Sequence, residues 1–220
     1  MWKAANRFHN ETKDNSMKVV PHQIGHFTKL AKQFRDHWKN DEENAKLRAA
    51  KCFSKCQEMS LAQAQHIIAL EHEFDSWKSL TQATALQLRL AIVMKKEPLL
   101  NNFGIGVAGV AHWDDYWATL VKRRADLRAS HSRIEETARW LGVFIKPIKT
   151  INTRSSSYGL KHRVEREIGY ITNGVFIAAA MIAGYPYRTH DGSPNVYFGM
   201  SEQSWKPIKA AQQARGEFYC

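Results

Sequence analysis

The spacing of apolar residues predicts helices over most of the chain. Between residues 22 and 38 the apolar positions recur every three or four residues, the period of a helix buried on one face. The same spacing predicts a charged helix over 41–56 and a long helix over 114–141. Residues 143–151 alternate loosely between apolar and polar, which predicts a strand, and Pro147 restricts it to a sheet edge. The chain is therefore predicted to be mainly α (α+β).

Helix start and stop signals divide the chain further. Ser60 and Gln63 have the spacing of a capping box, in which each side chain satisfies a free amide of the first turn. Asp75 or Ser76 is predicted to cap a helix that runs to residue 88. In the long helix over 114–141, Arg124 and His131 fall on the apolar stripe, so we expect buried stems with their polar heads in water.

The second half of the chain predicts two consecutive helices and a hairpin. Residues 157–168 form the first helix, Gly169 ends it, and Thr172 or Asn173 begins the second. The segments 185–189 and 195–200 flank an Asp-Gly-Ser-Pro turn, which predicts a β-hairpin. A polar, basic tail is expected after Trp205.

Two stretches of sequence resemble known groups of proteins. The segment SLAQAQHIIALEHEFDSWKSL resembles the small helical module labelled glyoxalase-related; the matching residues are Ser60, Ala62, Ala64, Ile68, Phe74, Ser76, Trp77 and Leu80. That resemblance covers 22–80 and implies a compact packing or interaction module, without glyoxalase chemistry. The motifs PIKTIN, SSYGLKH and YITNGVFIAAA resemble uncharacterised accessory proteins of plasmids, phages and integrative elements, which implies a role in a mobile element.

These patterns predict four regions. We expect a flexible arm over 1–20, a helical module over 21–100, a basic α+β domain over 101–205 and a tail over 206–220. Dimerisation through the apolar segment 175–183 and burial of that segment within one chain are equally compatible with the sequence.

The charge of the chain points to anionic partners. There are 32 Lys and Arg residues against 21 Asp and Glu, a formal net charge of +11, which favours phosphate backbones, anionic surfaces or an acidic protein. No apolar run reaches the roughly 18–20 residues of a membrane-spanning helix. The N-terminal residues lack the apolar core of a signal peptide, and three cysteines give no disulfide framework, so a cytoplasmic location is expected.

The positive charge is concentrated where a basic segment meets an apolar one. Residues 144–163 contain five Lys or Arg and no acid, and residues 175–183 contain no polar side chain. The apolar helix would anchor a surface that contacts phosphates. Candidate nucleic-acid contacts are Lys122, Arg123, Lys146, Lys149, Arg154, Ser156, Tyr158, Lys161, His162, Arg163 and Arg166. The alternative is an ordinary solvated surface, in which Lys161 pairs with Glu165 and Arg163 with Glu167 at i, i+4 spacing.

Other motifs allow weaker chemical interpretations. Residues 104–109 read G-x-G-x-x-G, but no buried parallel strand precedes them, which favours a flexible or closely packed loop over a nucleotide site. Cys52 and Cys56, with His66 or His72, lack the second tight pair of a structural zinc site. Serines 155–157 near His162 lack a nucleophile elbow. We therefore predict no metal, no cofactor and no catalytic residue.

Two functional hypotheses follow from the sequence. The first is a non-enzymatic nucleic-acid-binding accessory or regulatory protein of a mobile element, with DNA favoured over RNA. The alternative is a protein-interaction factor, for example an anti-defence inhibitor of a host complex that handles nucleic acid, because abundant aromatic residues also suit interface anchors.

Overall fold

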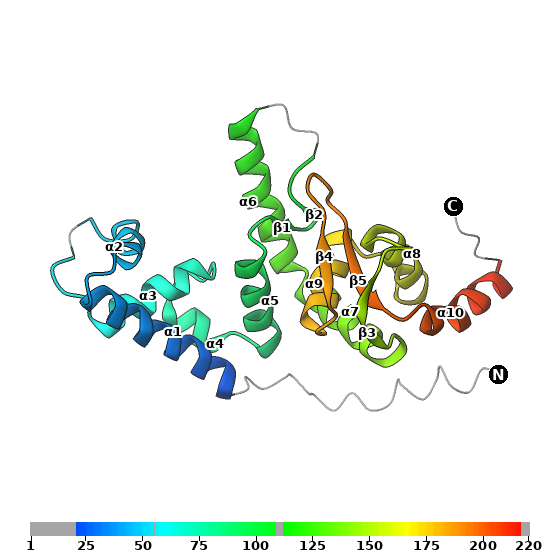
Figure 1. Ribbon diagram of the computed structural model, residues 1–220, viewed down its shortest axis with the longest axis horizontal. Coiled ribbons are helices and arrows are strands. Elements are labelled where there is room, and N and C mark those ends of the chain that lie inside the picture. Colours follow the sequence, from blue (N-terminus) through cyan, green and yellow to red (C-terminus); the bar gives the residue numbers. More distant parts are fainter. Residues whose placement is uncertain (1–20, 55, 109–111, 217–220) are drawn as a thin grey trace. The chain divides into compact units, whose positions relative to one another are not determined.

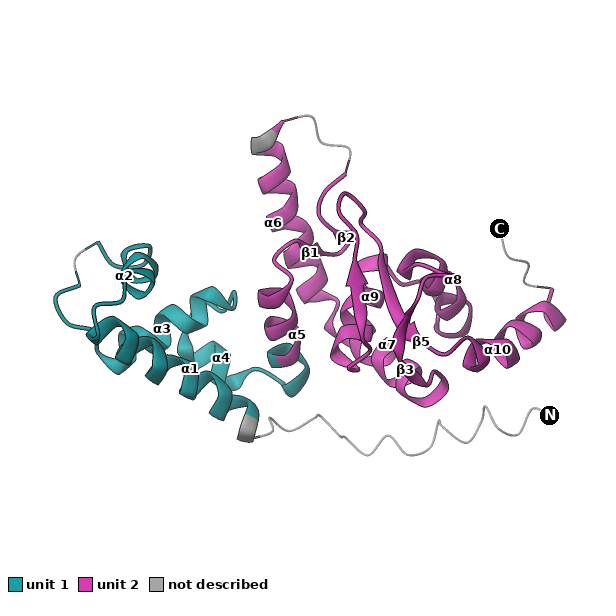
Figure 2. Ribbon diagram, viewed as in Figure 1, with its two compact units in different colours: residues 1–88 teal, residues 89–220 magenta. Residues whose placement is uncertain are grey.

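The computed structural model describes residues 21–54, 56–108 and 112–216 (Figure 1). The chain divides into two compact units, 1–88 and 89–220 (Figure 2). The described residues form ten helices and two small antiparallel sheets, which confirms the mainly helical α+β class. The predicted arm, 1–20, lies outside the described residues.

Helices α1 (Pro21–Lys39), α2 (Glu43–Ala50), α3 (Leu61–Glu71) and α4 (Trp77–Gln82) belong to the first unit, and α5 (Ala85–Lys96) crosses into the second. The predicted helix over 22–38 is confirmed as α1, whose Phe27 is fully buried. The charged helix predicted over 41–56 is too long, because the chain turns at residues 51 and 52. Leu47, which belongs to the apolar face predicted from the spacing, is exposed.

The predicted helix caps are confirmed in the first unit. The Gln63 amide donates to Ser60 Oγ at 3.2 Å, and the Ser60 amide donates to Gln63 Oε1 at 2.9 Å. Ser76 caps α4 in the same way. The helix predicted to run from there to residue 88 is interrupted, because Ala83 is extended and Thr84 starts α5 with a reciprocal pair of bonds to Gln87.

The second unit combines five further helices with two sheets. The helices are α6 (Trp113–Ala129), α7 (His131–Phe144), α8 (Ser157–Ile168), α9 (Asn173–Ile182) and α10 (Glu202–Ala214). The short strands β1 (Leu100–Asn101) and β2 (Gly104–Ile105) pair with each other. The larger sheet has the order β3-β5-β4, from β3 (Pro147–Asn152), β5 (Val196–Met200) and β4 (Tyr187–Thr189). The predicted hairpin and the predicted edge strand are both confirmed.

Helix α9 is the centre of this unit. Every residue from Asn173 to Met181 is buried, and α9 contacts α7, α8 and the β1–β2 hairpin. The Phe176 ring also meets the Phe198 ring of β5 edge to face, with centroids 5.9 Å apart. At its start, Thr172 Oγ1 accepts a hydrogen bond from the Val175 amide at 3.1 Å. The apolar segment is therefore buried within one chain.

Two glycines allow the β1–β2 hairpin to pack closely. A Cβ on Gly174 would lie 2.0 Å from the carbonyl oxygen of Asn101, and a Cβ on Gly104 would lie 2.2 Å from that of Pro194. Gly104 also has a φ of +140°, which residues with side chains rarely adopt. Of the G-x-G-x-x-G motif, Gly104 is tightly packed in the hairpin, whereas a Cβ on Gly106 would make an ordinary contact, 3.5 Å from Tyr116 Oη. Gly109 lies outside the described residues.

Two other expectations change in the second unit. The helix predicted over 114–141 is divided at Ser130, which joins α6 to α7. Arg124 was expected to hold its head in water, but its guanidinium donates to the carbonyls of Met94, Pro98 and Leu100 at 2.6–3.2 Å. It therefore caps the carboxyl end of α5, where carbonyls lack helical partners and attract cations. Residues 206–214, assigned from sequence to the tail, form most of α10.

In the part of the chain that the structure describes, no helix has both the length and the apolar character needed to cross a membrane.

Replacing Gly174 by alanine tests the close contact between α9 and the hairpin. We expect Gly174→Ala to lower the free energy of unfolding by about 1–3 kcal/mol, because the new methyl meets backbone that cannot move freely. Gly142→Ala is the control: it lies in α7 with no heavy atom within 4 Å of the new Cβ, so it should raise stability by about 0.5–1 kcal/mol. Urea denaturation measures both; equal effects would contradict the packing argument.

Candidate nucleic-acid interface

The predicted contact residues come from three parts of the second unit. Lys122 and Arg123 lie on α6, and Lys146, Lys149 and Arg154 lie on β3 or beside it. The remaining six lie on α8 or just before it: Ser156, Tyr158, Lys161, His162, Arg163 and Arg166. The structure separates these residues into a group exposed to solvent and a group engaged within the protein.

The exposed group follows strand β3. Lys146, Lys149 and Arg154 are exposed, and none forms an ion pair with a carboxylate among the described residues. Five residue steps along β3, from Pro147 to Asn152, face only two steps along β5, so the edge strand bulges. Because of this bulge, both Lys149 and its neighbour Thr150 are exposed instead of alternating in and out.

Lys122 on α6 resembles the three exposed cations along β3. It is exposed and has no ion-pair partner among the described residues. Its neighbour Arg123 is half-buried, and the guanidinium carbon lies 4.9 Å from the centroid of the Phe103 ring. The two adjacent α6 cations therefore differ: one is free in solvent and the other packs on an aromatic ring.

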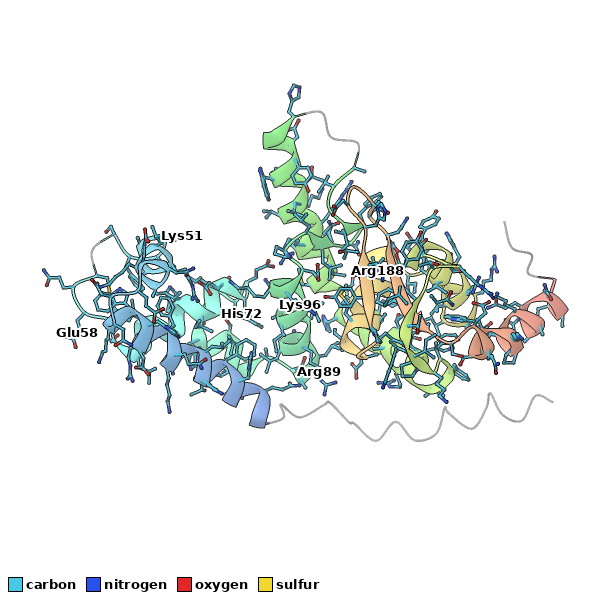
Figure 3. All side chains as sticks on the ribbon, viewed as in Figure 1. Lys51, Glu58, His72, Arg89, Lys96 and Arg188 are labelled. Atoms are coloured by element: carbon cyan, nitrogen blue, oxygen red, sulfur yellow. The ribbon has the colours of Figure 1, made fainter. Side chains whose placement is uncertain are left out.

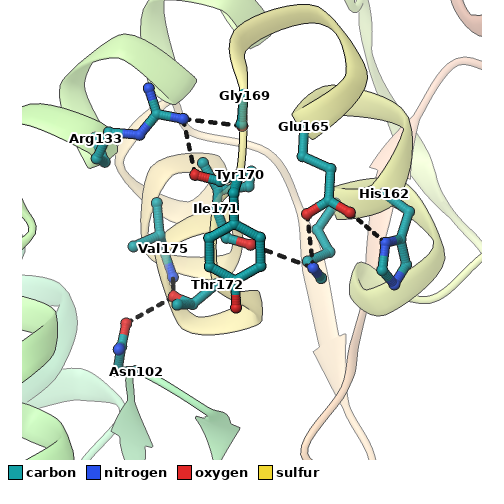
Figure 4. A network of polar contacts seen from close by, with 10 residues as sticks. Asn102, Arg133, His162, Glu165, Gly169, Tyr170, Ile171, Thr172 and Val175 are labelled. Atoms are coloured by element: carbon teal, nitrogen blue, oxygen red, sulfur yellow. Dashed lines mark hydrogen bonds and ion pairs between the residues drawn. The ribbon is translucent and has the colours of Figure 1, made fainter.

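Lys161 is the centre of the engaged group. Its residue is 5% exposed, and its ammonium donates to Glu165 Oε2 at 2.7 Å and to the Ile171 carbonyl at 3.3 Å. His162 Nδ1 contacts the other oxygen of Glu165, and Figure 4 shows these two side chains pointing toward one another. Lys161, a candidate nucleic-acid contact from the sequence, is therefore held inward by a carboxylate and a carbonyl. The predicted i, i+4 pair with Glu165 is present, but it is buried.

The Lys161–Glu165–His162 cluster shifts the pKa of its carboxyl group. Burial raises the pKa of Glu165, but hydrogen bonds from Lys161 and His162 outweigh this effect, and the pKa is lowered overall from the ordinary 4.5. The carboxylate is therefore ionised at neutral pH and balances the buried ammonium.

The arginines and serines around α8 are also largely committed to the fold. Arg163 donates to Ser155 Oγ at 2.9 Å, and its guanidinium lies 5.6 Å from the Trp205 ring of α10. Ser157 Oγ is buried and accepts from the Val196 amide. Ser156 occupies the N-cap position of α8, with no side-chain bond to the helix. Arg166 is half-buried on the same helix. The next residue, Glu167, accepts hydrogen bonds from Gln212 and Arg215 of the C-terminal region.

A residue that the sequence did not single out holds the connection between α8 and α9. Arg133 of α7 donates from Nη2 to the carbonyls of Ile168, Gly169 and Tyr170 at 2.9–3.0 Å; Figure 4 shows the bonds to Gly169 and Tyr170. As predicted, Gly169 ends α8, with a φ of +83°. Gly169 marks the end of α8 in the sequence. Nothing in the sequence shows that an arginine 35 residues before Ile168 binds the carbonyls at this helix end.

An open cleft of about 730 Å³ is lined in part by the Lys161–Glu165–His162 cluster. It is lined by Asn102, Phe103, Arg123, Asp126, Tyr158, Lys161, His162, Glu165, Tyr170, Thr172, Asn173, Pro194 and Asn195. The predicted contact residues Arg123, Tyr158, Lys161 and His162 thus share one cleft, whereas Lys146, Lys149 and Arg154 are not part of its lining.

The residues considered for metal binding have other environments. His72, labelled in Figure 3, is buried; its Nδ1 lies 2.8 Å from the Ile68 carbonyl and its ring packs edge-on against Phe27. Cys52 and Cys56 are free thiols. Across the described ranges, no three His, Cys, Asp or Glu side chains come together as a metal-binding group.

No protein-family model matches this sequence, and neither a curated protein nor a solved structure matches it. The resemblances to the glyoxalase-related module and to mobile-element accessory proteins therefore stay predictions.

Replacing Glu165 by glutamine tests the buried ion pair. At pH 7 we expect Glu165→Gln to lower the free energy of unfolding by roughly 3 kcal/mol, because the Lys161 ammonium stays buried without its counter-charge. The wild-type carboxylate contributes stability above its unfolded pKa, and that contribution is lost as the pH falls through the lowered folded pKa. The difference in the free energy of unfolding between the wild type and Glu165→Gln should therefore be smaller at about pH 4 than at pH 7.

Glu135→Gln is the matched control for this measurement. Its partner Arg139 is largely exposed and also lies at i, i+4 spacing, so the change should stay within about 1 kcal/mol. Urea denaturation of the three proteins at both pH values gives the comparison. A Glu165 variant as stable as the Glu135 variant at neutral pH would contradict the assigned role.

Proposed function

We propose that this chain is a non-enzymatic DNA-binding protein whose exposed cations along β3 contact backbone phosphates. The observation that carries the proposal is the acid-free segment 144–163, in which Lys146, Lys149 and Arg154 are exposed and have no carboxylate partner among the described residues. Cations that no internal carboxylate neutralises are free to replace the counterions of a nucleic-acid backbone.

The bulged edge strand supports this assignment. The bulge exposes consecutive residues of β3, and the chain then enters α8 directly through residues 153–156. Arg154 and the N-cap residue Ser156 lie in that link, next to the first amides of α8, and hydroxyls, amides and guanidinium groups all suit phosphate oxygens. Such contacts carry no base information, so affinity is expected to depend more on salt than on sequence.

The wider setting is also part of the proposal. The resemblance of the second half to mobile-element accessory proteins supports a regulatory or accessory role in such an element. The free thiols of Cys52 and Cys56 suit the reducing conditions of the cytoplasm.

One observation favours a protein-interaction factor as a second candidate. Among the described residues, strand β3 pairs with β5 on one side and with no strand on the other, so its outer edge can accept a strand from a partner protein. Pro147 lacks an amide hydrogen and the lysines discourage edge-to-edge pairing, which makes the edge better suited to an anion than to a strand. A partner that stays bound after nuclease treatment would favour this second candidate; a DNA tether would be removed by the nuclease.

The phosphate contacts can be tested through their dependence on salt. We expect the variant K146Q/K149Q/R154Q to bind duplex DNA more weakly than the wild type. The slope of log affinity against log salt should become shallower by about 0.9 for each phosphate that is no longer neutralised, or about 2.7 for all three substitutions. Fluorescence anisotropy across a salt series measures both quantities.

The matched control removes the same charge from the other unit. Lys29, Lys32 and Lys39 are exposed on α1, so K29Q/K32Q/K39Q changes the net charge equally. It should leave the slope near the wild-type value. Equal reductions in the two triple variants, or wild-type binding that ignores salt, would remove the assignment to β3.

A further inference from the structure

The cleft beside α8 combines exposed aromatic rings with a buried polar floor. Phe103, Tyr158 and Tyr170 line it and are 43%, 54% and 74% exposed. Large aromatic side chains are usually buried, so three exposed rings around one cleft need an explanation. The volume of about 730 Å³ falls within the roughly 300–1,000 Å³ of small-ligand sites.

The floor of the cleft is held rigidly by the hydrogen bonds already described. Lys161, Glu165 and His162 form one connected cluster, and the Thr172 hydroxyl donates to Asn102 Oδ1 at 2.6 Å. The Nδ1 atom of His162 is used by Glu165, while Nε2 has no partner among the described residues. A ligand would therefore meet a preorganised surface with one ring nitrogen of His162 still available.

Asn173 is fixed in the wall of the cleft by its hydrogen bonds. This residue is 6% exposed, and its Nδ2 donates to the carbonyls of Phe103 and Pro194 and to Asn195 Oδ1. Because two of these acceptors are backbone carbonyls, the amide orientation is fixed, and Oδ1 is left buried without a partner in the described structure. Arg123 Nη1 is also buried without a hydrogen-bond partner there.

We propose that the cleft binds one unpaired nucleotide of a DNA strand, with its base stacked on the exposed rings. This inference rests on the proposed DNA-binding function. Base stacking on aromatic side chains tolerates any sequence, as do the phosphate contacts of β3. Tyr158 lies four residues after Arg154 in the first turn of α8, so the phosphate-contacting link leads along the chain to the cleft. A base inside a duplex is already stacked and cannot enter, so the cleft confers a preference for single-stranded DNA.

Fluorescence anisotropy at one salt concentration can compare binding of a short single strand with binding of a blunt duplex of the same length and sequence. We expect Tyr158→Ala to weaken binding of the single strand roughly 5- to 150-fold and to leave binding of the duplex unchanged. Tyr158→Phe keeps the ring and should bind like the wild type. Trp117→Ala removes an exposed ring of α6 that lies outside the cleft lining and outside segment 144–163, and it should also have no effect.

The outcomes separate this inference from the proposed function. If the duplex binds with the expected salt dependence but Tyr158→Ala affects both DNA forms equally or neither, the cleft assignment is overturned and the phosphate contacts stand. If neither DNA form binds the wild type, both proposals fail. Adenosine monophosphate serves as a second probe: binding of the mononucleotide that depends on Tyr158, without binding of the single strand, would overturn the assignment to a strand-borne nucleotide.

Discussion

The second unit depends on the complete burial of α9. A helix with no polar side chain from Val175 to Ala183 is stable only where other elements cover all of its faces. The α7 and α8 helices and the β1–β2 hairpin contact it, and Phe198 reaches it from the sheet. This requirement leaves no room for a side chain at Gly174, where the hairpin backbone approaches most closely.

The link from α8 to α9 leaves carbonyl groups without helical partners, and two cations bind them. The connection from α8 must turn sharply between residues 169 and 172, which leaves several carbonyls without helical partners. Arg133 binds three of them, Ile168 to Tyr170, and Lys161 binds the next, Ile171. Arg124 caps α5 in the same manner. A substantial part of the positive charge thus stabilises the fold, so the formal charge of +11 overstates the charge available to a partner.

Local signals in the sequence predicted the elements well. The cap at Ser60 and the stop at Gly169 were predicted, and the caps at Ser76 and Thr172 were predicted to within one residue, because each depends on residues within a few positions of one another. The break at Ala83 also has a local cause, because Thr84 and Gln87 have capping-box spacing and start α5. The break at Ser130 interrupts apolar spacing that is otherwise continuous, so the local pattern does not show it.

The same distinction applies to the candidate site. The sequence shows that Lys161 can pair with Glu165, but whether that pair lies in water or in the protein depends on Ile171 and on the packing of α8 against α9. Likewise, the exposure of Lys149 beside Thr150 follows from a register shift against β5, a strand distant in the sequence. Charge at a position is therefore local information, while availability of that charge is not. Four basic residues of the candidate set, Lys122, Lys146, Lys149 and Arg154, meet both conditions, whereas Lys161 meets only the first. That division is why the proposed phosphate contacts follow β3, and why the proposed role of the α8 cluster is to shape a cleft.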